Sequence, residues 1–169
     1  MKAGHLVRLL GVVAIAGGFS LQAMPVGAVI DSDTASCSIT GTAAWGSAVT
    51  AVPGTHAFTF PLTWSCSALV GDEAGTWNIN FIGTSPDESC ASGHAVPTAT
   101  GSIEGRGPTG TTLTMSQSAS SFTFDGTINT AAETHHVHAQ INVNTPLCPW
   151  PANTPFQASG QGTLADANG

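Results

Sequence analysis

Two histidines at alternate positions of one segment are the residues of this sequence best placed to bind a metal. His136 and His138 lie in segment 134–144, where Val, Ala, Ile and Val at the odd positions alternate with polar residues at the even ones. Side chains two residues apart on a β-strand point to the same face and are roughly 6.6 Å apart along it, so both imidazoles can reach one ion. His135 has the opposite parity and belongs to the apolar face. The spacing predicts a zinc or copper(II) site that includes His136 and His138.

Such a site needs a third ligand, because two imidazoles hold a metal only loosely. The candidates that the sequence offers are His94, Glu104 and Asp125, at distances that the sequence does not give. An acidic protein attracts cations, which favours a site of this kind. The competing interpretation is a solvated strand face whose histidines simply suit a strand, and the sequence favours it. No other cofactor is indicated.

Hydrolytic chemistry has no recognisable motif in this sequence. A G-x-S-x-G elbow, which exposes a nucleophilic serine, does not occur. Glu104 and Glu133 are the glutamates near predicted strands, and nothing in the sequence brings them together as glycoside cleavage would require. We therefore expect a protein that is not an enzyme, with a hydrolase that lacks a known motif as the least favoured hypothesis.

Trp150 is the candidate for an exposed ligand-binding aromatic. It lies between two prolines and two residues after Cys148, and a flat aromatic face suits stacking on a sugar ring. The alternative, which we favour, is that this indole closes one end of the apolar core. Trp64 and Trp77 are in phase with predicted core residues and are expected inside.

The first 28 residues have the charged, apolar and small-residue order of a secretory signal peptide. Lys2 and Arg8 precede an apolar run that is shorter than the ~20 residues that a membrane-spanning helix needs. We expect cleavage after Ala28, with Ala23 as the alternative, and a single domain over residues 29–169. The protein is thus expected to be secreted, without membrane insertion after cleavage.

The charge balance after the predicted cleavage site narrows the range of partners. Arg106 is the one positive residue there, against ten Asp and Glu, which gives a formal net charge of −9. Such a surface cannot neutralise nucleic-acid phosphates or anionic lipids. Neutral glycans and proteins remain as partners, and nothing indicates an oligomeric state. Arg106 also ends a string, residues 103–106, that matches the recognition sequence of a processing protease.

Four cysteines predict two disulfides. Cys37, Cys66, Cys90 and Cys148 lack the short C-x-x-C spacing of zinc and redox sites, and an exported chain meets an oxidising environment. If strands alternate up and down, Cys37 opens the first strand and Cys66 closes the second, so both lie at one end. Cys90 and Cys148 follow later strands that finish at the other end. The prediction is Cys37–Cys66 and Cys90–Cys148, unless segment 47–52 is itself a strand and changes the parity.

Short alternating segments between turn residues predict an all-β protein. An apolar period of 3.6 does not persist for three turns anywhere after residue 28. The clearest strand is 56–66, in which Pro61 belongs to the polar face and predicts a sheet edge or a bulge. Asp125-Gly126 predicts a hairpin turn. About eight strands predict a single-domain antiparallel β-sandwich or small β-barrel, stapled by disulfides. The other predicted strands are 37–45, 76–82, 100–104, 111–116, 120–124, 135–144 and 156–164.

Three functions are consistent with these features. The leading hypothesis is a secreted or cell-envelope-associated binding domain that is not catalytic, because catalytic motifs are missing and loops on a rigid scaffold commonly carry recognition. The second is an extracellular metal-binding protein that uses His136 and His138. The third is the hydrolase without a recognisable motif.

Overall fold

Alternating apolar and polar residues form nine β-strands in the part of the chain that the structure describes. This computed structural model describes residues 34–68 and 75–167, so the predicted signal peptide, residues 1–28, lies outside the described residues. On each strand one parity is buried and the other faces water, as expected for a sheet with one apolar face. The strands are β1 (Thr34–Trp45), β2 (Gly54–Ala68), β3 (Gly75–Glu88), β4 (Ser92–Ala95), β5 (Thr98–Ser102), β6 (Gly110–Ser118), β7 (Ser121–Asn129), β8 (Thr134–Val143) and β9 (Phe156–Asp166).

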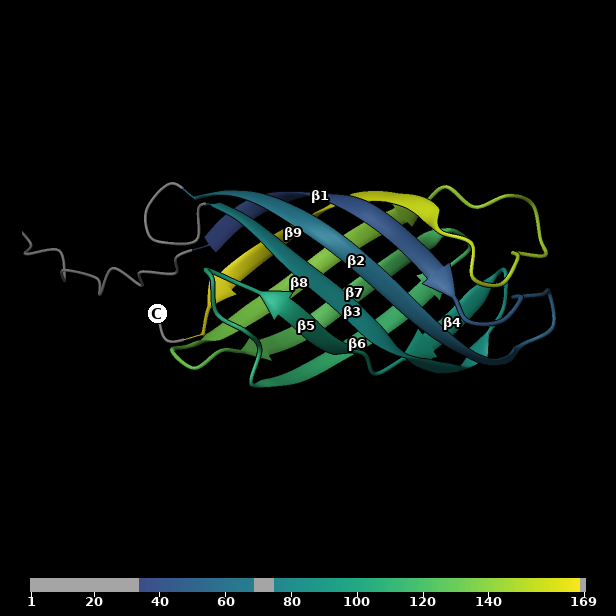
Figure 1. The fold of residues 1–169 in the computed structure, drawn as a ribbon, viewed down its shortest axis with the longest axis horizontal. Helices are drawn as coiled ribbons and strands as arrows, with labels where there is room; N and C mark the ends of the chain where they lie inside the picture. The colour runs from purple at the N-terminus through teal and green to yellow at the C-terminus, as the bar shows by residue number, and fades with distance from the viewer. Residues whose placement is uncertain (1–33, 69–74, 168–169) are drawn as a thin grey trace, which may run out of the picture.

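The nine strands form one antiparallel sheet that curls on itself (Figure 1). Their order in the sheet is β4-β6-β7-β8-β9-β1-β2-β3-β5, so the last strand of the chain pairs with the first. The curl brings the two edges of the sheet together, because β3 contacts β4 and β5 contacts β6. The predicted all-β, antiparallel, single-domain fold is confirmed, and its architecture is barrel-like.

The two edges of the sheet meet along a line that we call the seam. The strands at the seam explain why the described residues form nine strands where about eight were predicted. Residues 92–102 run along the seam as β4 and β5, and they change partner on the way: β4 pairs with β6, whereas β5 pairs with β3. The change falls at Val96 and Pro97, and a proline cannot donate a ladder hydrogen bond. β5 overlaps the predicted strand 100–104, whereas β4 was not predicted and is the additional strand.

Apolar side chains fill the inside of the barrel. Aromatic rings dominate its centre, where Phe60 packs edge to face on Phe124 and Phe81 stacks on the same ring at 4.5 Å. Such rings bury roughly 150–250 Å² each and account for much of the stabilisation of a core. No helix among the described residues is long and apolar enough to span a membrane. The largest fully buried side chains are Trp45, Trp64, Phe60, Phe81, Phe122, Phe124, Ile39, Ile79, Ile103, Leu113, Met115 and Ile128.

The prediction of a hairpin turn at Asp125-Gly126 is wrong, because both residues lie inside β7. Gly126 has a φ of 144°, and a Cβ there would collide with the carbonyl oxygen of Thr112 on β6. The glycine therefore allows β6 and β7 to approach closely in the middle of the sheet. The actual turn is Ala119-Ser120, between Ser118 and Ser121, and Ala119 has a φ of 52°.

Pro61 lies on the polar face as predicted, but β2 is not an edge strand. β2 pairs with β1 on one side and with β3 on the other. The β1–β2 register runs as far as Gly41 and Leu62 and resumes only at Ala44 and Thr59, so the ladder is interrupted opposite Pro61. The missing donor is accommodated by a gap in pairing inside the sheet.

Two disulfides join the strands and loops at opposite ends of the barrel, in the predicted pairing. Cys37 near the start of β1 is bonded to its direct cross-strand partner Cys66. Cys90, which follows β3, is bonded to Cys148 in the loop between β8 and β9. We call these two ends the Cys37 end and the Cys90 end. Two disulfides are typical of proteins in oxidising compartments.

Candidate functional site

His136 and His138 lie on the outer, polar face of β8, as their parity predicted. His138 contacts Asp125, its cross-strand partner on β7, with 2.8 Å between Nδ1 and Oδ2. A carboxylate only accepts hydrogen bonds, so Nδ1 of a neutral His138 carries the proton and Nε2 is left as an acceptor or a metal ligand. Asp125 thus orients the imidazole in the way that carboxylates orient metal-binding histidines.

The three predicted third ligands have different neighbours. Asp125 contacts His138 itself, so it would support that ligand rather than add a separate one. His94, on β4, lies 3.1 Å from Asp87. Glu104 lies 3.4 Å from Arg106. These contacts place His94 beside the end of β3 and Glu104 beside Arg106 in the turn after β5.

A different histidine is at the centre of a cluster of possible metal ligands. His135 is completely buried, and its Nδ1 lies 3.3 Å from Oδ1 of Asp166 while its Nε2 lies 3.8 Å from Oε1 of Glu133. Among the described residues, Glu133, His135 and Asp166 are the set whose ligand atoms approach one another closely enough to share an ion. Parity correctly assigned His135 to the apolar face, but sequence alone did not show that Asp166 is opposite it on β9.

An arginine balances the charge of this cluster. Nη1 of Arg106 lies 3.4 Å from Oε2 of Glu104 and 3.4 Å from Oε1 of Glu133. The guanidinium group of Arg106 thus lies beside Glu133, which is one of the three possible metal ligands. The arrangement links the turn after β5 to the start of β8 and closes the Cys37 end of the barrel.

A polar groove crosses the outside of four strands and has a volume of about 460 Å³. Among the described residues, no Asp, Glu, Lys or Arg lines it. A second depression of about 380 Å³ adjoins it and shares Gln140 and Gln161 with it. We call the larger depression the outer groove. The side chains that line the outer groove are Ser36 and Ser38 of β1, Ser65 and Ser67 of β2, His138 and Gln140 of β8, and Gln161 and Thr163 of β9, with Cys37 and Gly162 beneath them.

The strand register explains why this part of the surface is hollow. Two neighbouring cross-strand rows form the groove, and each runs from a longer side chain on β8 to small serines on β1 and β2. The first row is His138, Thr163, Ser36 and Ser67, and the second is Gln140, Gln161, Ser38 and Ser65. Serine side chains fill little space above the sheet, whereas His138, Gln140 and Gln161 have longer side chains.

Trp150 is not an exposed aromatic. It is only 2 % exposed and packs against Trp45 with 4.9 Å between ring centroids. Its backbone exchanges two hydrogen bonds with Val49, which fixes the loop over the Cys90 end. The favoured alternative, an indole that closes the end of the core, is therefore what the structure has.

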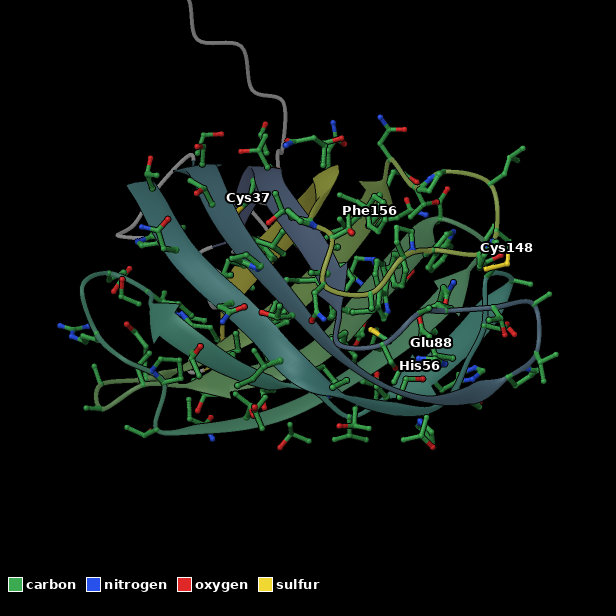
Figure 2. All side chains as sticks on the ribbon, turned by 45° about the vertical axis from the view of Figure 1, so that its right-hand side comes forward. Cys37, His56, Glu88, Cys148 and Phe156 are labelled. Atoms are coloured by element: carbon green, nitrogen blue, oxygen red, sulfur yellow. A yellow bond between two sulfur atoms is a disulfide. The ribbon has the colours of Figure 1, made fainter. Side chains whose placement is uncertain are left out.

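One serine–histidine pair bears on the hydrolase hypothesis. Oγ of Ser47 lies 2.8 Å from Nδ1 of His56, close to the Cys90 end (Figure 2). A catalytic pair needs a third group that orients the histidine. In the described parts of the chain, no carboxylate forms a hydrogen bond or ion pair with His56. This geometry gives the hydrolase hypothesis no support.

Comparison with known proteins supplies no relative for this chain: no family model matches the sequence, and neither a curated protein nor a solved structure is similar to it at a significant level.

Proposed function

We propose that this protein is a secreted, non-catalytic binding module whose outer groove holds a neutral, polyhydroxylated ligand such as an oligosaccharide. The observation that carries the proposal is the pair of cross-strand rows, in which hydroxyls, amides and the imidazole of His138 face outward without a carboxylate, ammonium or guanidinium group. Hydroxyls and amides both donate and accept hydrogen bonds, which is what a sugar's own hydroxyls require.

A rigid base supports this assignment. The groove lies on regular antiparallel sheet, and Cys37 beneath it is covalently joined to Cys66 on the neighbouring strand. Binding groups on a sheet lose little conformational freedom when a ligand arrives, so more of the contact energy appears as affinity. Gln140 and Gln161 are direct cross-strand partners and stand between the two depressions, where one ligand can contact both amides.

The chemistry of the groove also sets an expectation for affinity. Among the described residues no Trp or Phe lines it as an aromatic platform. Its polar groups are hydrated before a ligand binds, so each hydrogen bond to the ligand replaces one to water. We expect dissociation constants of about 1 mM for short oligosaccharides, which corresponds to roughly −4 kcal/mol. Longer or multivalent ligands gain by occupying the adjoining depression as well.

A screen of neutral and acidic glycans, followed by calorimetry, tests this function. We expect neutral oligosaccharides to bind and acidic ones to be rejected by the surrounding negative protein. Gln140→Ala/Gln161→Ala should weaken binding at least tenfold. Gln157→Ala is the matched control, because Gln157 is an exposed glutamine of the same strand, β9, outside the groove. Unchanged binding in the double variant, or no neutral ligand in the screen, would contradict the proposal.

Metal binding is the second candidate, and the contact between Asp125 and His138 favours it. The carboxylate fixes the imidazole with Nε2 available, and His136 lies on the same face of β8. Zinc and copper(II) titrations should then give binding that is lost in His136→Ala/His138→Ala. Binding that is lost only in His135→Ala would assign the metal to the buried cluster with Glu133 and Asp166. Equal binding by wild type and both sets of variants would remove this candidate.

A further inference from the structure

Glu88, the last residue of β3, is a fully buried carboxyl group at the Cys90 end (Figure 2). The indole Nε1 of Trp45 donates a hydrogen bond of 3.1 Å to its Oε1. Its other oxygen, Oε2, is buried and has no hydrogen-bond partner among the described residues. Burial of a carboxylate oxygen without a hydrogen-bond donor costs free energy, so ionised Glu88 would be destabilising in this position.

Gln117 on β6 faces this oxygen with an acceptor of its own. Its amide nitrogen donates to the carbonyl oxygens of Ser89, at 3.0 Å, and Ala119, at 2.8 Å. These two carbonyls fix the orientation of the amide, because only nitrogen can donate to both. Its Oε1 is buried and has no partner among the described residues. A Cβ on Gly93 would collide with both oxygens, so Oε2 of Glu88 and Oε1 of Gln117 lie around one small space.

We propose that Glu88 is a protonated carboxylic acid in the folded protein, that it donates its proton to Oε1 of Gln117, and that loss of this proton loosens the Cys90 end. One proton satisfies both buried acceptors at once. It also needs no extra volume, which suits a space bounded by Gly93. The burial of Glu88 supports this assignment because it raises the pKa of the carboxyl group to about 7, although the nearby hydroxyl of Ser85 and the indole of Trp45 act in the opposite direction.

Few charged groups face Glu88 from the surrounding elements. Asp87 is the preceding residue on the same strand, and its charge raises the pKa of Glu88, whereas His94 on β4 lowers it. Asp87 and His94 contact each other at 3.1 Å, which partly cancels their effects. His56 is the titratable group on the adjoining part of β2 and contacts Ser47. The packed side chains Trp45 on β1 and Gln117 on β6 do not titrate, and neither do any in loops 46–53 and 144–155.

The proton is coupled to the loops through Gln117 and the turn that carries Cys90. Gln117 holds this turn through the Ser89 carbonyl, and the backbone N–H of Cys90 donates to the carbonyl oxygen of Thr50 in the β1–β2 loop. The disulfide then connects the same turn to Cys148 in the β8–β9 loop. When Glu88 ionises, two acceptors face each other and a buried charge is left without a donor. Three loops consequently lose a common anchor.

The sign of the pH effect follows from the direction of the pKa shift. The carboxyl group binds its proton more tightly in the folded state, with a pKa of about 7 against an ordinary value of 4.5. Its contribution to stability is complete below the ordinary value and is lost as pH rises through about 7. We therefore expect the Cys90 end to be tightest in mildly acidic solution.

Carbon-13 NMR of the full protein, labelled at glutamate Cδ, tests the assignment directly, because the chain has only four glutamates. Glu88 should titrate with a midpoint near 7. Trp45→Phe removes a donor to the carboxylate and should raise that midpoint, whereas Glu104→Gln, at the other end of the barrel, should leave it unchanged. A Glu88 midpoint near 4.5 would overturn the proposal.

The variant Glu88→Gln tests the coupling to the loops. A glutamine can accept from Trp45 and donate to Gln117 at every pH, so it imitates the protonated acid. We expect the melting temperature of the wild type to fall between pH 5 and pH 8 relative to this variant, and the amide of Cys90 to lose hydrogen-exchange protection above pH 7 only in the wild type. The same pH dependence in both proteins would overturn the coupling. If the variant does not fold, the exchange protection of Cys90 in the wild type decides the question, because a constant value across pH 7 would contradict it.

Discussion

Oδ2 of Asp125 lies 2.8 Å from Nδ1 of His138 across the ladder between β7 and β8. His138 lines the outer groove, so the carboxylate on the neighbouring strand fixes how an imidazole is presented to that groove. The contact is exposed, and its contribution to global stability is expected to be small. Its consequence is local and chemical: it determines which ring nitrogen is available.

We predict that neutral His138 has its proton on Nδ1. Nitrogen-15 NMR of the imidazole ring distinguishes the two tautomers. In Asp125→Ala the preference should be lost, because no acceptor then faces Nδ1. A wild-type His138 with the proton on Nε2 would show that the carboxylate does not orient the ring.

Removal of the Trp150 indole should destabilise the fold as a whole. Trp150→Ala leaves a cavity against Trp45 at the Cys90 end, and large-to-small changes of this kind cost about 3–5 kcal/mol. Denaturant unfolding measures the loss, and Trp150→Phe should cost less because it keeps an aromatic ring. A change below about 1 kcal/mol combined with lost ligand binding would indicate an aromatic platform instead.

The two disulfides should contribute unequally to stability. The closed segments have sequence separations of 29 for Cys37–Cys66 and 58 for Cys90–Cys148. Chain entropy then predicts losses of about 3.5 and about 4 kcal/mol when each pair is replaced by serines. The Cys90–Cys148 variant should also weaken the loop contacts at its end, because the disulfide holds in place the turn whose Cys90 N–H donates a hydrogen bond to the carbonyl oxygen of Thr50. An equal or reversed order in urea unfolding would contradict this account.

Arg106 should resist trypsin in the folded protein. It closes a tight turn in which Ile103 and Arg106 exchange two backbone hydrogen bonds, and Ile103 is fully buried. A protease has to bind its substrate in an extended form, which this turn cannot adopt without local unfolding. Mass spectrometry should find the bond after Arg106 intact in native protein and cleaved after denaturation. Rapid cleavage of the native protein would show that the turn opens freely.

Sequence periodicity was sufficient for the fold class and the inner faces of the strands, because alternation with a period of two is a strong local signal. It placed Phe58, Phe60 and Trp64 inside and His136 and His138 outside, as the structure has them. The disulfide pairing followed as well, since an antiparallel meander determines which strand ends meet. The strand faces and the ends at which consecutive strands meet both depend on residues and strands that are adjacent along the chain.

The remaining features depend on which strands are adjacent, and spacing does not show this. Asp125-Gly126 has the residue types of a hairpin turn, but it lies inside β7. The glycine is needed there because a side chain would collide with the backbone of β6. The outer groove requires β8, β9, β1 and β2 side by side, and this depends on the pairing of the last strand of the chain with the first. The surroundings of Glu88 could not be predicted for the same reason, because its donor Trp45 comes from β1 and Gln117, whose Oε1 lies near the same glycine, Gly93, comes from β6.

The central claim is that a neutral glycan binds in the outer groove, and NMR mapping of the bound state tests it most directly. In a titration with a neutral oligosaccharide, the side-chain amides of Gln140 and Gln161 should shift together and saturate with one dissociation constant, while Gln157 stays unchanged. Shifts confined to the loops at the Cys90 end, or no shifts at saturating ligand, would contradict the account.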